Sequence, residues 1–255
     1  MLDIFDISAR HILITGASSG LGQHAARVFS AYGANLTLAA RRLDRLNTLA
    51  DELRTEGRKV CVVKMDVCDE KSVTAGFDTA IEALGVPDVV LNNAGVTHTA
   101  SALKTEQQDW ERVIDTNLNG VWFVAREAGH RMTKNQTNGS IINVASILGM
   151  RVAGGVSAYA TSKAAVIQLT KSLALEWARY GIRVNALAPG YMETDLNREF
   201  FATEAGKELI KRVPQRRLGQ LSELDGPLLL LASDASSFMT GSIIAVDGGH
   251  LVSSL

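Results

Sequence analysis

The fold is decided by the stretch Thr15-Gly16-Ala17-Ser18-Ser19-Gly20-Leu21-Gly22, which continues the apolar run His11–Thr15. Glycines at positions 16, 20 and 22 allow a tight turn and leave no Cβ in the way of an approaching phosphate. A segment of helical period follows, and the N-terminus of a helix offers unpaired N–H groups and a partial positive charge to an anion. The stretch therefore predicts a strand–turn–helix unit that binds a dinucleotide; a packing turn without a ligand is the alternative.

Outward from this stretch, short apolar runs alternate with longer segments of helical period along the whole chain. Nearly continuous apolar runs are typical of parallel strands that are covered on both faces. We expect strands over His11–Thr15, Leu36–Ala40, Val60–Lys64, Val89–Asn92, Ser140–Ala145, Arg183–Ala188 and Ser242–Val246. We expect helices over Leu21–Tyr32, Leu43–Thr55, Glu70–Leu84, Glu106–Lys134, Ala158–Tyr180 and Leu221–Leu231. The alternation predicts one α/β domain over residues 1–255, a doubly wound Rossmann-type sheet of about seven parallel strands with helices on both faces.

The segment Tyr191–Arg217 interrupts this alternation because it is too long for an ordinary connection. Long connections in α/β domains are commonly lids or binding loops, so we expect a substrate lid over residues 191–217. Its second half is rich in basic residues: Lys207, Lys211, Arg212, Arg216 and Arg217. A solvated helix face is the favoured interpretation of these residues, and an anion-binding patch is the alternative.

Composition excludes several classes of protein. The 255 residues are 46% hydrophobic and 21% charged, with a formal net charge of −1 at pH 7, which excludes a disordered chain and predicts no general attraction to nucleic acid or anionic membranes. Two cysteines exclude a disulfide scaffold, and the five histidines show no metal-ligand spacing. The N-terminus is acidic where a signal peptide is basic, and no apolar run approaches the roughly 18 residues of a membrane span. We expect a cytoplasmic protein without a metal site.

A second group of residues consists of candidates for catalysis. Tyr159 and Lys163 are four residues apart near the start of a predicted helix, which places the phenol and the ammonium on one helix face. Ser146 directly follows a predicted strand, and side chains at the carboxyl ends of strands point into the crevice where open α/β sheets bind ligands. Ser157 and Ser162 are the competing serines. A half-buried tyrosine beside a solvated lysine is the alternative without function.

In these motifs the sequence resembles the short-chain dehydrogenase/reductase family over essentially the whole chain. The resemblance rests on Thr15–Gly22, on Asn92-Asn93-Ala94-Gly95, on Asp66 after the third strand, and on Pro189-Gly190 with Thr194 four residues later. It also implies a catalytic set made of Asn117, Ser146, Tyr159 and Lys163. The cofactor-binding residues that it implies are Gly16, Ser18, Ser19, Gly20, Leu21, Gly22, Asp66, Val67, Asn93, Ala94, Gly95, Tyr159, Lys163, Pro189, Gly190 and Thr194. Gly226-Pro227 departs from the family, whose last helix usually has good helix formers here.

The predicted chemistry is hydride transfer between a nicotinamide and a ketone or secondary alcohol. We expect Tyr159 to be the general acid in reduction and the general base in oxidation, with Lys163 and an oxidised nicotinamide lowering the pKa of its phenol. Ser146 is expected to donate a hydrogen bond to the carbonyl oxygen. The resemblance further implies that Lys163 binds the nicotinamide ribose and that Asn117 positions a water that relays the proton.

The choice of cofactor depends on the end of the second strand. An NAD-specific chain usually has Asp or Glu at the position of Ala40, whereas this chain continues with Arg41 and Arg42. A guanidinium forms charge-assisted hydrogen bonds to a 2′-phosphate that a carboxylate repels, and Ser19 can add a neutral one. We predict NADP(H) over NAD(H), with Arg41 as the main determinant; two solvated arginines are the alternative.

The prediction of the substrate rests on the residues expected around the pocket. The expected pocket residues are mostly apolar and comprise Met150, Val152, Tyr191, Met192, Leu196, Phe200 and Phe201, which favours a hydrophobic ketone or alcohol over a sugar or a carboxylate. The resemblance leaves open a 3-oxoacyl-[acyl-carrier-protein] reductase that docks its partner on the basic residues between Lys207 and Arg217. A dinucleotide-sensing regulator without catalysis is a further alternative, although such relatives typically lose the Tyr or the Lys. Resemblance also implies a homotetramer.

Overall fold

The computed structural model describes residues 4–55, 57–193 and 198–253, and its strands form a single parallel sheet. The strand order is β3-β2-β1-β4-β5-β6-β7, and all six neighbouring pairs are parallel. The strands are β1 (His11–Thr15), β2 (Asn35–Ala40), β3 (Val60–Lys64), β4 (Val89–Asn92), β5 (Gly139–Val144), β6 (Ile182–Pro189) and β7 (Ile243–Val246). The predicted doubly wound α/β class is confirmed.

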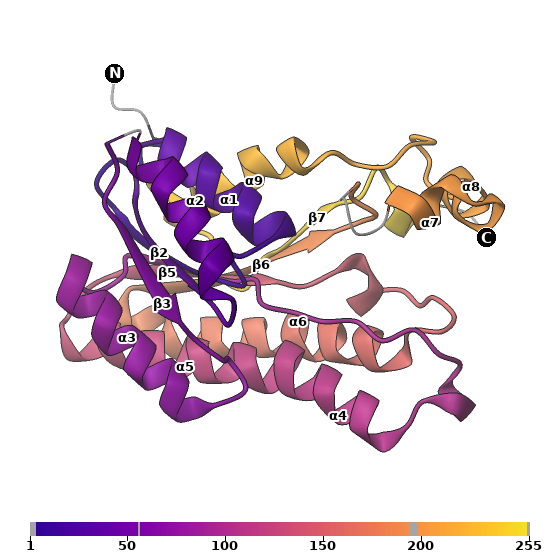
Figure 1. The fold of residues 1–255 in the computed structure, drawn as a ribbon, viewed down its shortest axis with the longest axis horizontal. Helices are drawn as coiled ribbons and strands as arrows, with labels where there is room; N and C mark the ends of the chain where they lie inside the picture. The colour runs from indigo at the N-terminus through magenta and orange to yellow at the C-terminus, as the bar shows by residue number, and fades with distance from the viewer. Residues whose placement is uncertain (1–3, 56, 194–197, 254–255) are drawn as a thin grey trace.

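Helices cover both faces of the sheet (Figure 1). One face is covered by α1 (Gly20–Ala31), α2 (Leu43–Thr55) and α9 (Asp225–Ala232). The other face is covered by α3 (Glu70–Leu84), α5 (Gly120–Lys134) and α6 (Ser157–Trp177), with α4 (Gln107–Ile114) beside them. The short helices α7 (Arg198–Ala202) and α8 (Glu204–Lys211) lie beyond the ends of β6 and β7, at the right of Figure 1.

Each predicted strand agrees with an observed one to within one residue at either end. Two predicted helices differ in their interior. The helix expected over Glu106–Lys134 is interrupted by a π-helical turn at Asp115–Asn119. The helix expected over Leu221–Leu231 begins as a 3₁₀ turn and becomes α-helical at Asp225, two residues before Pro227. That start agrees with proline geometry, because the first turn of a helix tolerates a residue without an N–H.

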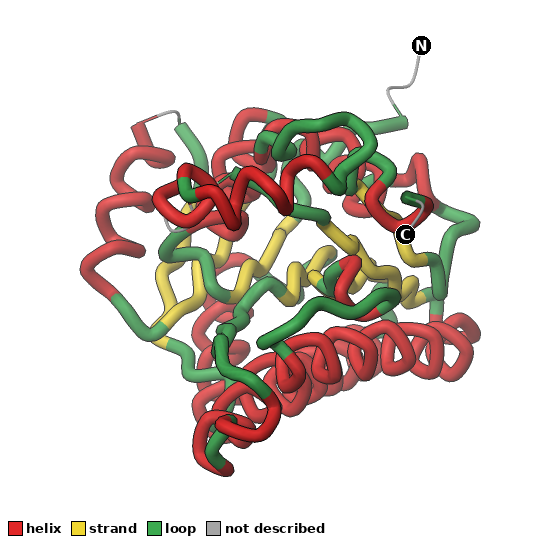
Figure 2. Tube along the Cα trace, turned by 90° about the vertical axis from the view of Figure 1, so that its right-hand side faces the viewer, coloured by secondary structure: helices red, strands yellow, loops and turns green. Residues whose placement is uncertain are grey.

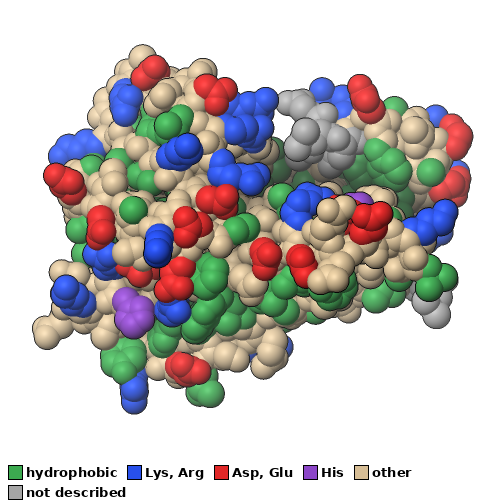
Figure 3. Space-filling view, turned by 60° about the horizontal axis from the view of Figure 1, so that its bottom comes forward, with side chains coloured by type: hydrophobic (Ala, Val, Ile, Leu, Met, Phe, Trp, Pro, Cys, Tyr) green, Lys and Arg blue, Asp and Glu red, His purple; other side chains and the backbone are tan. Residues whose placement is uncertain are grey.

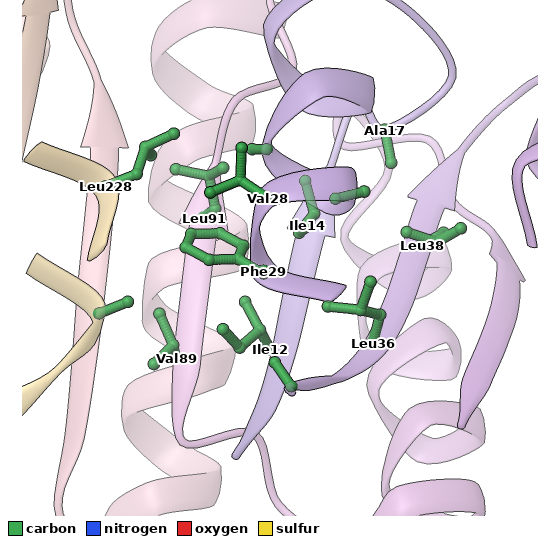
Figure 4. Close-up of a cluster of buried hydrophobic side chains, with 14 of the residues drawn as sticks. Ile12, Ile14, Ala17, Val28, Phe29, Leu36, Leu38, Val89, Leu91 and Leu228 are labelled. Carbon is green, nitrogen blue, oxygen red and sulfur yellow. The ribbon is translucent and has the colours of Figure 1, made fainter. Parts of the chain in front are cut away.

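The core is divided between the two faces by the alternation of side chains along the strands. In β1, Ile12 and Ile14 pack with Val28 and Phe29 of α1, as Figure 4 shows, whereas Leu13 belongs to the cluster on the opposite face. All of these except Val28 are fully buried. Burial of one such side chain contributes about 1.5–3 kcal/mol, so these two layers hold the sheet between its helices.

The carboxyl ends of the strands form the edge at which the predicted site residues gather. The order reverses between β1 and β4, because β2 and β3 lie on one side of β1 and β4 to β7 on the other. Ligands of open α/β sheets bind in the crevice at such a switch point. Figure 2 is turned towards the side on which α7 and α8 lie, and shows the strands running between the helical layers.

Candidate active site

The turn after β1 is held against the segment that follows β4. Asn93 Nδ2 donates to the carbonyl oxygens of Thr15 at 3.0 Å and Gly16 at 3.2 Å. Gly16 has φ +66°, and a Cβ on it would lie 2.8 Å from the Cα of Ala94. Only glycine fits this close approach, which fixes the shape of the turn.

The start of α1 offers donors to a ligand. Ser19 is the N-cap residue, and its side chain makes no capping hydrogen bond. Gly20 has φ +55°, and a Cβ on it would meet nothing within 4 Å. The turn therefore presents main-chain N–H groups and an open surface, a combination that fits the pyrophosphate of a dinucleotide.

A cavity of about 490 Å³ continues from this turn along the ends of β2 and β3. Arg42 Nη2 donates to Ser18 Oγ at 2.9 Å and to Ser19 Oγ at 3.1 Å. Arg41 makes no hydrogen bond or ion pair with the described part of the chain, and both arginines are exposed. The cavity lining consists of Gly16, Ser18, Ser19, Leu21, Ala40, Arg41, Arg42, Met65, Asp66, Val67, Asn93, Ala94, Gly95, Val96 and Thr116. These residues fit an adenosine whose ribose carries a 2′-phosphate.

The predicted catalytic side chains meet where β5 and α6 approach each other. The Ser146 hydroxyl accepts the N–H of Leu148 at 3.1 Å and forms a side-chain hydrogen bond with Tyr159. Lys163 Nζ lies 5.6 Å from the centre of the Tyr159 ring and donates to the carbonyl oxygen of Val144 at 2.6 Å. Ser146, Tyr159 and Lys163 thus line a single cavity.

Burial governs the protonation of this group. It raises the pKa of the Tyr159 phenol, and this effect is larger than the opposing effect of the Ser146 hydrogen bond. It lowers the pKa of Lys163 from 10.5 to about 8. The expected net lowering of the Tyr159 pKa is not found in the chain without its cofactor, because loss of water around the phenolate dominates.

Asn117 lies in the π-helical turn and is fully buried. Its Oδ1 accepts the N–H of Val96 at 2.8 Å, while its Nδ2 donates to the Val96 carbonyl at 2.9 Å and to Ser162 Oγ at 3.2 Å. The amide therefore ties the segment after β4 to α6. Turns of this kind are frequent at functional sites.

The two competing serines have other environments. Ser162 is fully buried and donates to the main-chain oxygen of Tyr159 at 2.7 Å, and Ser157 is the first residue of α6. Neither lines the cavity that contains the Tyr159 phenol, whereas Ser146 does.

The whole cavity has a volume of about 510 Å³. Four of the predicted pocket residues line it: Tyr191, Met192, Phe200 and Phe201. Figure 3 shows a hollow in the right half of the molecule with hydrophobic side chains on its wall. Pro189 and Gly190 line the cavity as well, whereas Thr194 and Leu196 lie outside the described residues.

Met150 and Val152, which were also expected in the pocket, lie outside this cavity. Met150 is 44% exposed and Val152 is 87% exposed, and neither lines the cavity. A 3₁₀ turn at Ile147–Gly149 directs the chain outward after Ser146. The lining residues that we did not predict are Val96, Thr97, Val144, Ala145, Ile147, Leu148, Val156 and Leu221. Several directly follow a motif residue in sequence, which was the available signal.

The basic residues between Lys207 and Arg217 are mostly paired with acids nearby. Lys207 contacts Glu204 at 2.7 Å and Lys211 contacts Glu208 at 2.6 Å, each within α8. Arg217 forms two hydrogen bonds with Glu223, at 2.6 and 2.7 Å. This pairing agrees with a solvated helix face.

In residues 4–55, 57–193 and 198–253, no group of three or more His, Cys, Asp or Glu side chains is placed to hold a metal ion. None of the helices in these residues is long and apolar enough to cross a membrane.

Several known proteins are similar to this chain over nearly its whole length. The family model described as Enoyl-(Acyl carrier protein) reductase matches residues 16–250. Gluconate 5-dehydrogenase of Gluconobacter oxydans is 35% identical over 252 residues, 98% of either chain. The 3-oxoacyl-[acyl-carrier-protein] reductase FabG of Thermotoga maritima is 38% identical over 240 residues, 94% of this chain and 97% of its own.

A solved structure extends the likeness to three dimensions. Gluconate 5-dehydrogenase of Burkholderia cenocepacia, in complex with NADP and tartrate, is 37% identical and superimposes with a TM-score of 0.95 over 99% of both chains. The chain belongs to the short-chain dehydrogenase/reductase family. It is therefore an oxidoreductase that acts on CH–OH groups with NAD(P).

Proposed function

We propose that this protein is an NADP(H)-dependent oxidoreductase that interconverts a hydrophobic ketone and its secondary alcohol, with Tyr159 as the general acid and base. The observation that carries this proposal is the meeting of Ser146, Tyr159 and Lys163 in one cavity that adjoins the glycine turn. A bound nicotinamide dinucleotide supplies or accepts the hydride at this place.

The side chains of this group handle the proton. Ser146 donates a hydrogen bond to the substrate oxygen, and Tyr159 gives its phenolic proton to that oxygen as negative charge develops there. Lys163 is held by the Val144 carbonyl beside the Tyr159 ring, where its ammonium stabilises the phenolate that remains. Lys163 also binds the nicotinamide ribose, and Asn117 positions the water that returns a proton to Tyr159.

The preference for NADP(H) is supported by the adenosine end of the cleft. Ala40 leaves the end of β2 without a carboxylate, and Arg41 and Arg42 both line the cavity there. Arg42 already donates to Ser18 and Ser19, so it can bridge the glycine turn and a 2′-phosphate. NADP is bound in the solved structure of the Burkholderia cenocepacia relative.

The preference for a hydrophobic substrate is supported by the composition of the cavity wall. Lys163 is the single charged side chain among the described lining residues, and the proposed chemistry occupies it. A carboxylate substrate needs a cation of its own for tight binding, and most of this wall is aliphatic or aromatic. The relatives named for gluconate are therefore an imperfect guide to this substrate.

The two alternatives have less support. A 3-oxoacyl-[acyl-carrier-protein] reductase requires a basic docking surface, but Lys207, Lys211 and Arg217 are paired with neighbouring acids. A dinucleotide-sensing regulator has no need of Ser146, Tyr159 and Lys163 in one cavity.

A substrate panel tests the proposal. We expect the protein to oxidise NADPH with aryl ketones, and to turn over a 3-oxoacyl thioester or a sugar acid at least tenfold less efficiently in kcat/KM. Turnover confined to sugar acids would overturn the hydrophobic assignment. Tight dinucleotide binding without turnover of any carbonyl compound would favour the regulator.

We further propose that the protein is a homotetramer in the cytoplasm. The surface of α4 and α5 exposes Trp110 at 39% and Trp122 at 36%, and α6 exposes Leu175 at 84%. The edge strand β7 is only partly buried. Apolar faces of this kind are consistent with packing across two-fold axes. Light scattering at micromolar concentration should give four times the mass of the chain, and a monomer would refute the tetramer.

A further inference from the structure

The Tyr191 hydroxyl is a polar group in the substrate cavity that the proposed proton transfer does not use. Tyr191 follows the Pro189-Gly190 pair at the end of β6, and it lines the cavity together with Ser146 and Tyr159. Its hydroxyl makes no hydrogen bond to the part of the chain that the structure describes. A hydroxyl of this kind is available to a ligand.

The backbone of Tyr191 is fixed from both sides. Gly190 N donates to the Val246 carbonyl at 2.9 Å, and Gly219 N donates to the Tyr191 carbonyl at 2.9 Å. A Cβ on Gly190 would lie 2.8 Å from the Cα of Asp247, so the ends of β6 and β7 are in close contact here. These contacts hold the backbone of Tyr191 in place at the end of β6.

The ring of Tyr191 is packed between two other rings. The Phe201 ring lies 5.7 Å away in an edge-on arrangement, and the His250 ring lies 5.4 Å away with a tilt of 44°. Arg151 holds the segment of His250, because its Nη1 donates to the His250 carbonyl and, at 3.1 Å, to Ser253 Oγ. Packing of the ring fixes the position of the phenolic oxygen, about which the O–H can turn towards an acceptor.

The surroundings favour a hydrogen-bond acceptor opposite this hydroxyl. Burial raises the pKa of Tyr191, so the phenol stays protonated and remains a donor at neutral pH. The positive charges of Arg151 and Arg212 act on this pKa in the opposite direction, with a smaller effect. Tyr191 also raises the pKa of Tyr159, which places the two phenols near each other.

We propose that Tyr191 is a specificity-determining residue whose hydroxyl binds a second acceptor oxygen of the substrate, separate from the oxygen held by Ser146 and Tyr159. This inference rests on the proposed ketone reduction and makes its substrate class narrower. The preferred substrate is a largely apolar ketone that carries a second, uncharged carbonyl oxygen at a distance from the reacting carbon. Tyr191 takes no part in proton transfer.

Two ketones of nearly equal size test the proposal, cyclohexanone and cyclohexane-1,4-dione. The unmodified protein should prefer the dione in kcat/KM, after correction for its two equivalent carbonyls. Tyr191→Phe should lower kcat/KM for the dione about three- to tenfold, as expected for one neutral hydrogen bond, and should change that for cyclohexanone less than twofold. Tyr180→Phe is the matched control, because its hydroxyl is bound by Arg179 at 2.5 Å, outside the cavity.

A third substrate, 4-oxocyclohexane-1-carboxylate, distinguishes a neutral acceptor from an anionic one. If the acceptor is a carboxylate, contrary to the proposal, Arg212→Gln lowers kcat/KM for this compound as Tyr191→Phe does, and leaves the dione unchanged. If the acceptor is neutral, Tyr191→Phe affects the dione and Arg212→Gln affects neither compound.

Failure of this inference is distinguishable from failure of the proposed function. If Tyr191→Phe changes kcat/KM equally for cyclohexanone and for both functionalised ketones, the proposed role of Tyr191 is wrong. The proposed function still stands in that case if Tyr159→Phe loses the reduction of cyclohexanone. Absence of NADPH oxidation with every ketone would overturn both. A melting temperature of Tyr191→Phe within about 2 °C of the unmodified protein should accompany the expected result.

Discussion

The two ends of the cleft differ in how deeply their positively charged side chains are buried. At the catalytic end, Lys163 is only 4% exposed and burial lowers its pKa to about 8. At the adenosine end, Arg41 and Arg42 are exposed on the rim of the cavity. A buried ammonium has a tunable pKa and destabilises the fold, whereas a guanidinium at the surface stays charged and destabilises little. The comparison indicates that chemistry is placed where water is excluded and cofactor selection where it is not.

The largest expected effect is at the catalytic end. Tyr159→Phe removes the phenolic proton and should lower kcat/KM for a good ketone substrate by about 10²–10⁴, the range that general acid catalysis contributes. Dinucleotide binding, measured by fluorescence titration, should stay within about threefold. Retention of more than a tenth of the activity would show that another group protonates the substrate.

The second prediction concerns the stability of the catalytic end. The pKa of Lys163 falls from 10.5 to about 8 in the folded protein, so at pH 7 the fold carries a buried charge that the unfolded chain keeps in water. Lys163→Met should therefore raise the free energy of unfolding at pH 7 by about 1–3 kcal/mol, the upper value following from about 1.4 kcal/mol per pKa unit, while activity is lost. Loss of the hydrogen bond to the Val144 carbonyl makes the gain smaller.

The pH dependence separates this explanation from a simple packing effect. Between about pH 8 and pH 10 the folded protein releases the Lys163 proton and the unfolded chain keeps it, so the stability of the unmodified protein rises with pH in this window. Urea denaturation should show the advantage of Lys163→Met shrinking over the same range. A constant difference at every pH would mean that the charge of Lys163 is not the cause.

The third prediction addresses the adenosine end. Arg41→Ala should raise KM for NADPH about tenfold and leave KM for NADH within about twofold, because one charge-assisted hydrogen bond contributes about 1.5–3 kcal/mol. Arg42→Ala tests the hydrogen bonds to Ser18 and Ser19 and should have a similar or smaller effect. Both effects should weaken at high salt because these arginines are exposed. A better kcat/KM with NADH than with NADPH in the unmodified protein would contradict the assignment.

The two ends also differ in how their residues were predicted. The places of the glycine turn, Arg41, Ser146, Tyr159 and Lys163 in the cleft follow from sequence, because strand ends and helix spacing determine them. The expected lowering of the Tyr159 pKa does not appear in the chain by itself, because it is outweighed by burial among residues distant in sequence. The helix from Glu106 was expected to be continuous, since a π turn leaves the apolar pattern nearly unchanged.

The wall of the substrate cavity was predicted only in part for a related reason. Tyr191, Met192, Phe200 and Phe201 line it as expected, but the residues after Ser146 were assigned by proximity in sequence. A 3₁₀ turn changes the direction of the chain within three residues, so Ile147 and Leu148 face the cavity and Val152 does not. No periodicity in the sequence indicates such a turn.

The smallest expected effect tests whether Val152 contacts the substrate. Val152 is 87% exposed and lies outside the cavity lining, so Val152→Ser should change kcat/KM for an apolar ketone less than twofold and the free energy of unfolding by less than about 0.5 kcal/mol. Leu148→Ser is the matched variant, since Leu148 follows the same turn and lines the cavity. It should raise KM for the same ketone about fivefold or more, because it replaces apolar contact with a hydroxyl that lacks a partner. Equal effects of the two substitutions would mean that the chain after Ser146 closes over the substrate, and that the sequence-based assignment of Val152 holds for the bound state.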